Sequence, residues 1–182
     1  SIGEYAFYFA TSLTAITIPN SVTSIGEYAF HRTTALKTVT FASGSALASI
    51  ETSAFNGASS LTSINIPNSV TSIGNSAFSG TNSLTTISIP SSVTSIGTYA
   101  FNRTTALKTV TFASGSKLAS IGGSAFNEAS ALTSIIIPSS VTSIGGHAFN
   151  NATALASVTF EGNAPIASGT AFNNVTGAVA NI

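Results

Sequence analysis

The chain has 182 residues, of which 5% are charged, and five basic and five acidic side chains give a formal net charge of zero. This low net charge removes the electrostatic basis for binding nucleic acid or an anionic membrane, and a hydrophobic content of 43% excludes a disordered chain. No apolar run approaches the ~20 residues of a membrane span. Because the sequence has no Cys and no Asp, it excludes disulfides, thiol nucleophiles and a Ser-His-Asp relay.

The dipeptide Ala-Phe recurs along the whole chain at intervals of 23 or 25 residues. Self-similarity at such a period predicts an array of units that each contact only their neighbours. We therefore expect residues 1–182 to form a single repeat array, with residues 160–182 as its degenerate last repeat or cap. The repeats end at Phe7, Phe30, Phe55, Phe78, Phe101, Phe126, Phe149 and Phe172.

Each unit is expected to begin with a β-strand. In residues 61–66 (Leu-Thr-Ser-Ile-Asn-Ile) the last two apolar residues alternate at period two, which predicts a strand with one buried face. Proline lacks the N–H that a β-ladder needs, so the prolines that follow these segments are expected to end the strands. They are Pro19, Pro67, Pro90 and Pro138.

The second half of each unit is expected to turn back to the core. Val70 and Ile73 would point inward, and Gly74 would permit a tight turn before the closing Phe78. Glu51 stands where other units have this glycine, so the turn does not strictly demand a positive φ. The two 25-residue units place eight residues, instead of six, between flanking apolar positions, as in 41–50 and 112–121. We expect a loop inserted between two fixed core positions.

Taken together, Leu-x-x-Ile-x-Ile and the following Ser-Val-Thr-Ser-Ile-Gly-x-x-Ala-Phe resemble the BspA-type, or Treponema-type, leucine-rich repeat. The resemblance implies a right-handed, β-rich solenoid with one parallel strand per 23–25-residue repeat plus a short convex strand or turn. It also implies a cell-surface or extracellular location and a role in protein binding and adhesion. The family often has Cys three residues after the Phe. Here that interior position holds a small residue, at Ala10, Thr33, Ala58, Thr81, Thr104, Ala129 and Ala152.

The first residues repeat a later segment, because Ser1–Phe7 matches Ser24–Phe30. The chain therefore starts within a repeat, without a signal peptide or capping unit, and we expect it to belong to a longer array. Exposed aromatic side chains at Phe7, Tyr8 and Phe9 would favour weak end-to-end association of an otherwise monomeric chain.

The outward-facing strand positions are the candidate binding surface on the concave face. They are small, hydroxylated and almost uncharged, and we expect them to contact a protein ligand on another cell or matrix surface. Alternatively, they simply suit a strand and the array is a structural spacer. The candidate residues are Thr17, Thr38, Thr40, Ser63, Asn65, Thr86, Ser88, Thr109, Thr111, Ser134, Ser157 and Thr159.

A second set of hydroxyls, in the Thr-Ser pairs at 23–24, 71–72, 94–95 and 142–143, suggests a remote third alternative, an ice-binding face. The mixture of residue types and the two unit lengths argue against a flat, lattice-matched surface.

No arrangement in the sequence indicates catalysis, a cofactor or a metal. His31 and His147 lie five units apart, and the five glutamates are scattered along the chain. The glycines occur singly at the repeat turn, and no serine stands in a nucleophile elbow. We expect a protein that is not an enzyme, and basic residues too dispersed to bind nucleic acid.

Overall fold

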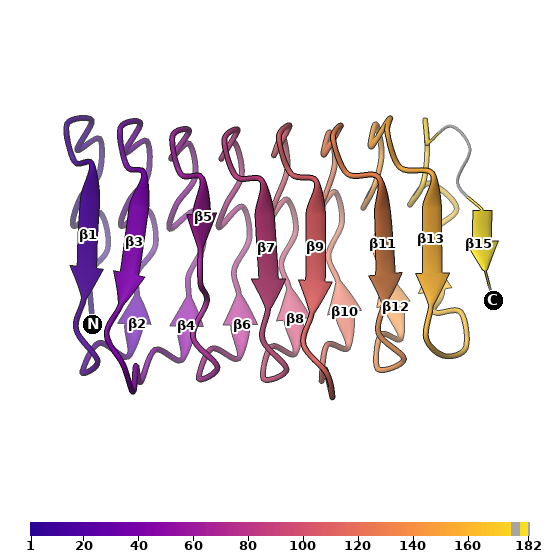
Figure 1. The fold of residues 1–182 in the computed structure, drawn as a ribbon, viewed down its shortest axis with the longest axis horizontal. Coiled ribbons are helices and arrows are strands. Elements are labelled where there is room, and N and C mark those ends of the chain that lie inside the picture. The colour runs from indigo at the N-terminus through magenta and orange to yellow at the C-terminus, as the bar shows by residue number, and fades with distance from the viewer. Residues whose placement is uncertain (176–178, 182) are drawn as a thin grey trace.

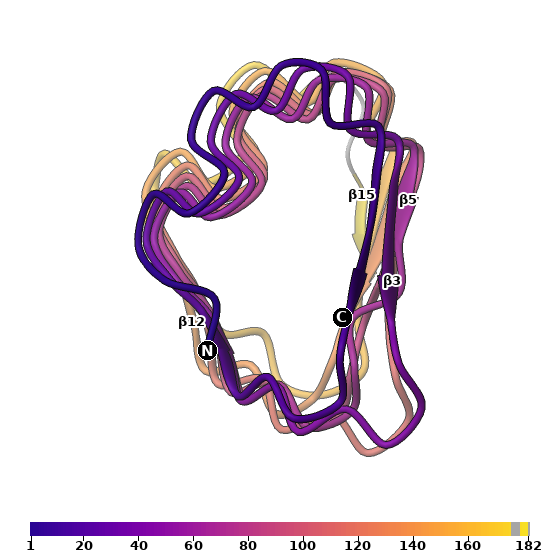
Figure 2. The ribbon, with the colours of Figure 1, turned by 90° about the vertical axis from the view of Figure 1, so that its left-hand side faces the viewer.

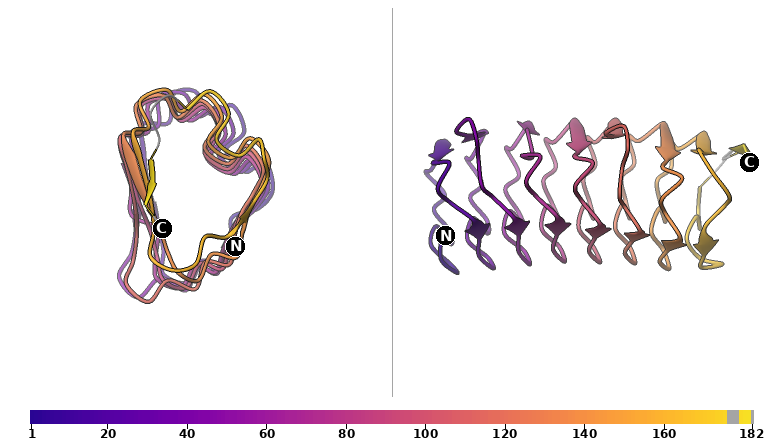
Figure 3. Two further views of the ribbon diagram at one scale, coloured as in Figure 1. Left: turned by 90° about the vertical axis from the view of Figure 1, so that its right-hand side faces the viewer. Right: turned by 90° about the horizontal axis from the view of Figure 1, so that it is seen from below.

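Successive coils of the chain lie side by side along one axis, with the first and last coils at opposite ends (Figure 1). The computed structural model describes residues 1–175 and 179–181. In these residues the chain forms a parallel β-solenoid of about seven turns without a helix. Most coils have a strand of three or four residues on one side, reduced to two residues in β5, and a two-residue strand on the other, so two rows of strands flank the core (Figure 3). The solenoid predicted from the repeat is confirmed.

The longer strands are β1 (Ala15–Ile18), β3 (Thr38–Phe41), β5 (Ser63–Ile64), β7 (Thr86–Ile89), β9 (Thr109–Phe112), β11 (Ser134–Ile137), β13 (Ser157–Phe160) and β15 (Val179–Asn181). The short strands are β2 (Ser24–Ile25), β4 (Ser49–Ile50), β6 (Ser72–Ile73), β8 (Ser95–Ile96), β10 (Ser120–Ile121), β12 (Ser143–Ile144) and β14 (Ile166–Ala167). The short strands form one continuous seven-stranded sheet, whereas the longer strands fall into three separate sheets.

The breaks between the longer strands follow the prolines. Four-residue pairing occurs for β1 with β3, β7 with β9 and β11 with β13. In each pair the residue after the second strand donates its N–H to the preceding coil: Ala42 to Ile18, Ala113 to Ile89 and Glu161 to Ile137, each at 3.0 Å. Coils with Pro at this position cannot make that bond. In the segment before Pro67, β5 pairs with β3 over only two residues. In the segment before Pro90, β7 is joined to the preceding coil only by an isolated bridge between Ser88 and Asn65. In the segment before Pro138, β11 does not pair with β9. The prolines therefore end the strands, as predicted, and also open the sheet.

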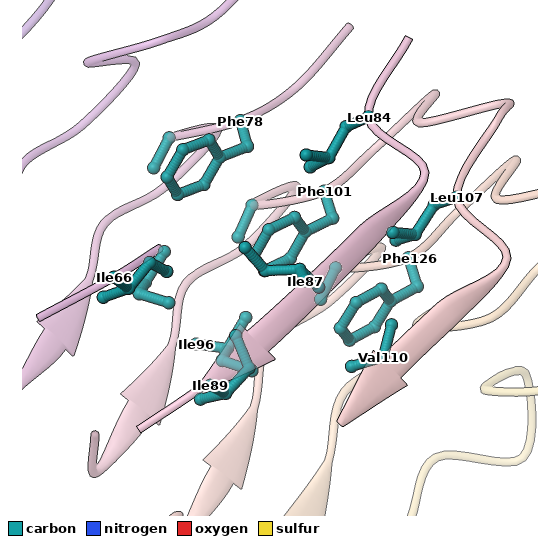
Figure 4. Packing of buried hydrophobic residues seen from close by; sticks show 14 of the residues in the cluster. Ile66, Phe78, Leu84, Ile87, Ile89, Ile96, Phe101, Leu107, Val110 and Phe126 are labelled. Carbon is teal, nitrogen blue, oxygen red and sulfur yellow. The ribbon is translucent and has the colours of Figure 1, made fainter. Parts of the chain in front are cut away.

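The core repeats similar apolar side chains from coil to coil, and Figure 4 shows this for Phe78, Phe101 and Phe126 and for Leu84 and Leu107. The closing phenylalanines stack along the axis with ring centroids 4.9 to 5.3 Å apart and planes within 7° of parallel. Phe30 through Phe149 in this series are fully buried, and the predicted inward Val70 and Ile73 are buried as well. Three positions beyond the Phe, the hydroxyls of Thr33, Thr81 and Thr104 donate to the phenylalanine carbonyl at 2.7 to 2.8 Å. This bond satisfies a polar group that would otherwise be costly to bury.

The turn around each phenylalanine is held by backbone bonds to the next coil. The residues two before, at, and two after the Phe donate their N–H groups to the following coil, as Tyr28, Phe30 and Arg32 do at 2.7 to 3.0 Å. We call this arrangement the turn ladder. The residues two before and two after the Phe have a left-handed backbone: among the described residues, thirteen non-glycine residues have φ between 53° and 60°, and Gly57 and Gly80 share the conformation. Because a left-handed residue costs roughly 1–2 kcal/mol without compensation, the ladder's hydrogen bonds must offset that strain.

The glycine that follows each short strand has a different role from the one predicted. Gly26, Gly74, Gly97, Gly122 and Gly145 do not have positive φ, which agrees with the expectation from Glu51 that the turn does not demand it. A Cβ on Gly97 would instead lie 2.6 Å from the Asn75 nitrogen in the preceding coil. Glycine therefore permits close approach of neighbouring backbones. Glu51 occupies this position in one coil, where the Ser49 hydroxyl donates to its carboxylate at 2.6 Å.

The end of the chain carries two further strands, because β14 pairs with β12 and β15 pairs with β13. The degenerate last repeat or cap at 160–182 includes 176–178 and 182, which lie outside the described residues. Its role as a cap stays a prediction.

The close approach of the coils predicts the effect of adding a single methyl group. Gly97→Ala should lower the free energy of unfolding by about 1–3 kcal/mol, because the Cβ meets the Asn75 backbone and overpacks the contact. Gly3→Ala is the matched control: it stands at the same repeat position, but nothing lies within 4 Å of its Cβ. Urea unfolding measures both variants. Equal midpoints for the two would contradict the close-approach explanation.

Candidate binding face

The twelve predicted binding residues all lie on the outward side of the longer strands, which we call the long-strand face. Ser157 and Thr159 are half-buried, and the other ten are exposed. Strand register aligns equivalent positions, for example Thr17 with Thr40 and Thr86 with Thr109. However, the sheet breaks at β5/β7 and β9/β11 divide the face, so the residues form three groups and not one uninterrupted surface.

The hydroxyls of this face differ from those on the short-strand side. On the short-strand side, Thr71, Thr94 and Thr142 donate to carbonyls of the preceding coil at 3.1 to 3.2 Å. On the long-strand face, Thr111 donates to the Ile87 carbonyl at 3.5 Å, and no other predicted binding residue has a side-chain hydrogen bond among the described residues. The hydroxyls of the long-strand face are therefore available to a ligand.

The two unit lengths do not disturb the register of the short strands. Ser24, Ser49 and Ser72 stand in register although a 25-residue unit separates the first two. The extra residues leave the coil on the other side, so the short-strand sheet stays regular. Its exposed threonine column is interrupted by Ala48 and Ala119, however. The threonine column therefore is not the unbroken row of threonines that an ice-binding face would use, although the neighbouring serine column is continuous from Ser24 to Ser143.

The turns around the closing phenylalanines carry polar side chains that were not among the predicted binding residues. In the position after each Phe, Asn127 donates to Asn102 at 2.8 Å and Asn150 donates to Asn127 at 2.7 Å, forming an amide ladder. Beside it, Arg103 and Glu128 form an exposed ion pair at 3.2 Å. Both residues are left-handed. The signal available in the sequence was the recurrence of Asn one residue after Ala-Phe.

The first two coils replace this ladder with aromatic rings. Tyr5 stacks on Tyr28 at 5.2 Å, Tyr8 stacks on His31 at 5.1 Å, and the Arg32 guanidinium lies 5.3 Å from the Phe9 ring centroid. Tyr5, Tyr8 and Phe9 are exposed, as predicted for the last two. Phe7 departs from the prediction, because it is half-buried against Phe30.

His31 is the chemically unusual member of the aromatic cluster. Its Nδ1 is buried without a hydrogen-bond partner among the described residues. Burial lowers the pKa of His31 below 6.5, and the neighbouring Arg32 guanidinium lowers it further. Both effects favour the neutral imidazole over the charged form.

The described residues contain no group of three His, Cys, Asp or Glu side chains that could hold a metal ion. In the part of the chain that the structure describes, no helix is long and apolar enough to cross a membrane. His31 and His147 belong to well-separated coils, as expected from their spacing.

The fold and the repeated sequence place the chain in a known class of repeat domains. The family model described as the BspA type leucine rich repeat region matches in six copies, over residues 1–118 and 48–179. The chain belongs to this BspA-type leucine-rich-repeat family.

Solved structures with the same fold come from several bacteria. A leucine rich cell surface protein from Faecalibacterium prausnitzii A2-165 is 37% identical over 88% of this chain and 42% of its own, with a TM-score of 0.79. The leucine rich repeat protein of T. pallidum is 27% identical over 98% of this chain and 71% of its own, with a TM-score of 0.66. The pneumococcal vaccine antigen PcpA is 33% identical over 81% of this chain and 30% of its own, with a TM-score of 0.54. The chain thus spans less than half the length of the Faecalibacterium protein. None of the curated proteins matches the chain.

The environment of His31 predicts a pH dependence of stability. A pKa lowered by folding means that the unfolded chain binds the proton more tightly, so stability falls as pH drops from above 6.5 toward the folded pKa. His31→Asn introduces the residue that stands at this position in the next coil, Asn56, and should reduce that dependence. Urea unfolding between pH 7.5 and pH 5.5 measures it. An unchanged slope in the variant would contradict the prediction.

Proposed function

We propose that the chain is a non-enzymatic protein-binding module of a secreted or cell-surface protein. Its ligand would be a protein on another cell or on a matrix surface. The supporting observation is the long-strand face, where exposed side chains are aligned by strand register and their hydroxyls are largely free of internal bonds. The similarity to a leucine rich cell surface protein supports the location.

The chemistry of the face is consistent with recognition of a neutral, polar protein surface. None of the twelve candidate residues is charged, so long-range electrostatic steering would contribute little. Binding would depend on shape and hydrogen bonds, with each net hydrogen bond contributing about 0.5–1.5 kcal/mol. Several coils acting together could therefore give useful affinity. A structural spacer, by contrast, would place no demand on these side chains.

Charged substitutions on the long-strand face test the proposal. A Thr40→Lys, Thr86→Lys double variant should lose binding to a purified ligand protein by at least about tenfold, because bulky charges replace small hydroxyls at a desolvated contact. The ligand protein is selected by titrating wild-type chain over an array of purified cell-surface and matrix proteins, with affinity measured by surface plasmon resonance.

The matched control is a Thr23→Lys, Thr94→Lys double variant, which places the same charges on exposed positions of the short-strand side. It should bind as wild type does. Unfolding midpoints of both variants should stay near the wild-type value, since all four positions are exposed. Failure of wild type to bind any protein of the array, or equal losses in both double variants, would support the spacer alternative.

A further inference from the structure

Two loops project beyond the outline of the other coils, near the ends of β3 and β9 (Figure 2). They carry the same sequence, Phe-Ala-Ser-Gly-Ser, at 41–45 and 112–116. Phe41 and Phe112 stand in register with Ile18 and Ile89, which are fully buried, whereas both phenylalanines are half-buried. The phenylalanine ring is therefore less deeply buried than the isoleucine at the same position of the preceding coil. The backbone that follows it projects outward as a loop.

Each projecting loop is bonded to the preceding coil. Around the second loop, Ala113 donates to the Ile89 carbonyl and Lys117 to the Ser91 carbonyl, both at 3.0 Å. On the other side, Pro138 has no N–H to donate to the Phe112 carbonyl, and β9 does not pair with β11. The loop is therefore fixed on one side and separated from its neighbour on the other.

A groove lies beside each loop, although at the first loop the Ser69 hydroxyl of the following coil donates to the Ser45 carbonyl at 2.9 Å. The first groove, of about 320 Å³, lies between residues 41–45 and the following coil at Asn65 and 67–69. The second groove, of about 390 Å³, lies between residues 110–116 and the following coil at Ile136, Pro138 and Ser139, with Glu161 at its edge. The loops repeat after 71 residues, so the two grooves are equivalent positions of the array.

Three positions differ between the two grooves, and at one of them, Asn68 in the first and Ser139 in the second, both side chains are polar and uncharged. Ile136 in the second groove corresponds to Asn65 in the first, and Glu161 corresponds to Pro90. Ile136 is 55% exposed, which is unusual for a large apolar residue on this otherwise hydroxylated face. Glu161 is exposed and its carboxylate has no ion pair or hydrogen bond among the described residues. Only the second groove combines an exposed apolar side chain with a free carboxylate.

We propose that the second groove binds an extended peptide segment in which an apolar side chain stands next to Lys or Arg. The apolar side chain would cover Phe112 and Ile136, and the cation would pair with Glu161. The hydroxyls of Ser114, Ser116 and Ser139 line the same groove and would bond peptide groups of the segment. No basic residue lines the groove, so the charge of Glu161 selects for a cation. The proposal rests on the proposed protein-binding function and locates one contact of it.

The test uses ¹⁵N-labelled chain and four blocked peptides, N-acetylated and C-amidated: Gly-Leu-Arg-Gly, Gly-Leu-Gln-Gly, Gly-Leu-Glu-Gly and Gly-Gly-Arg-Gly. The Leu-Arg peptide should shift backbone amides in 110–116, 134–137, Ser139 and Glu161 on titration into the millimolar range. It should bind about two- to fivefold more tightly than the Leu-Gln peptide, as for a partly exposed ion pair. The Leu-Glu and Gly-Arg peptides should bind more weakly still.

Single substitutions separate the two contacts. Glu161→Gln should remove the preference for Arg over Gln while keeping binding of the Leu peptides. Ile136→Asn, which gives the second groove the residue of the first, should weaken the Leu-Arg peptide at least about fivefold. Asn65→Ile is the reciprocal variant and should create new shifts at 41–45. Asn65 and Ile136 are both exposed, so these two substitutions should leave the fold intact. The amide spectrum of each variant shows directly whether it is folded.

Several outcomes would overturn the groove proposal: no shift with any peptide at 10 mM, shifts outside the second groove, or full binding in the Ile136→Asn variant. Larger shifts of the same amides with maltotriose would assign the groove to a neutral sugar instead.

The proposed function can fail separately. Peptide binding with no capture of any whole protein would refute the protein-binding function and leave the groove established. Capture of a protein that depends on Thr40 and Thr86, with no peptide binding, would overturn the groove alone.

Discussion

Close contact between the backbones of successive coils is the constraint on which this structure depends. The turn ladder and the continuous sheet of short strands bond each coil to the next. Where the coils approach most closely, glycines leave no room for a Cβ. The phenylalanine rings fill the interior at the same repeat distance, about 5 Å, which is also the spacing of paired strands. A single coil could not bury its apolar side chains, so stability is shared along the array.

The same constraint explains why the long-strand side is the variable side. Neighbouring coils are bonded at the turn ladder and the short strands, so pairing of the longer strands can be interrupted without separating the coils. Proline after a strand removes one bond, and the two-residue insertions after Phe41 and Phe112 form longer loops. Together these changes open grooves at two equivalent places. Recognition features can therefore vary on one side while the rest of the coil is kept constant.

The repeat, the buried phenylalanines and the inward aliphatic positions could be predicted from the sequence, because each depends on residues within one unit. The long-strand face followed from alternation at Ile64 and Ile66. The left-handed residues could not be predicted, since Tyr28, Arg32 and Ser53 occupy positions where glycine is the usual signal.

The grooves were missed for a different reason. Pro138 matters because it faces Phe112 in the preceding coil, and a unit considered alone does not show which neighbour it meets. The role of the glycine after the short strand was missed for the same reason. Its close contact is with the backbone of the preceding coil, which the sequence of a single unit does not show.

Hydrogen exchange measured by NMR tests the central claim most directly. The amide protons of Phe78, Phe101 and Phe126, which donate across the turn ladder at 2.7 Å, should be among the slowest to exchange. The amides of the projecting loops at 43–44 and 114–115 should exchange rapidly in the same sample. Exchange of the phenylalanine amides as fast as that of the loops would show that the turn ladder does not hold the coils together.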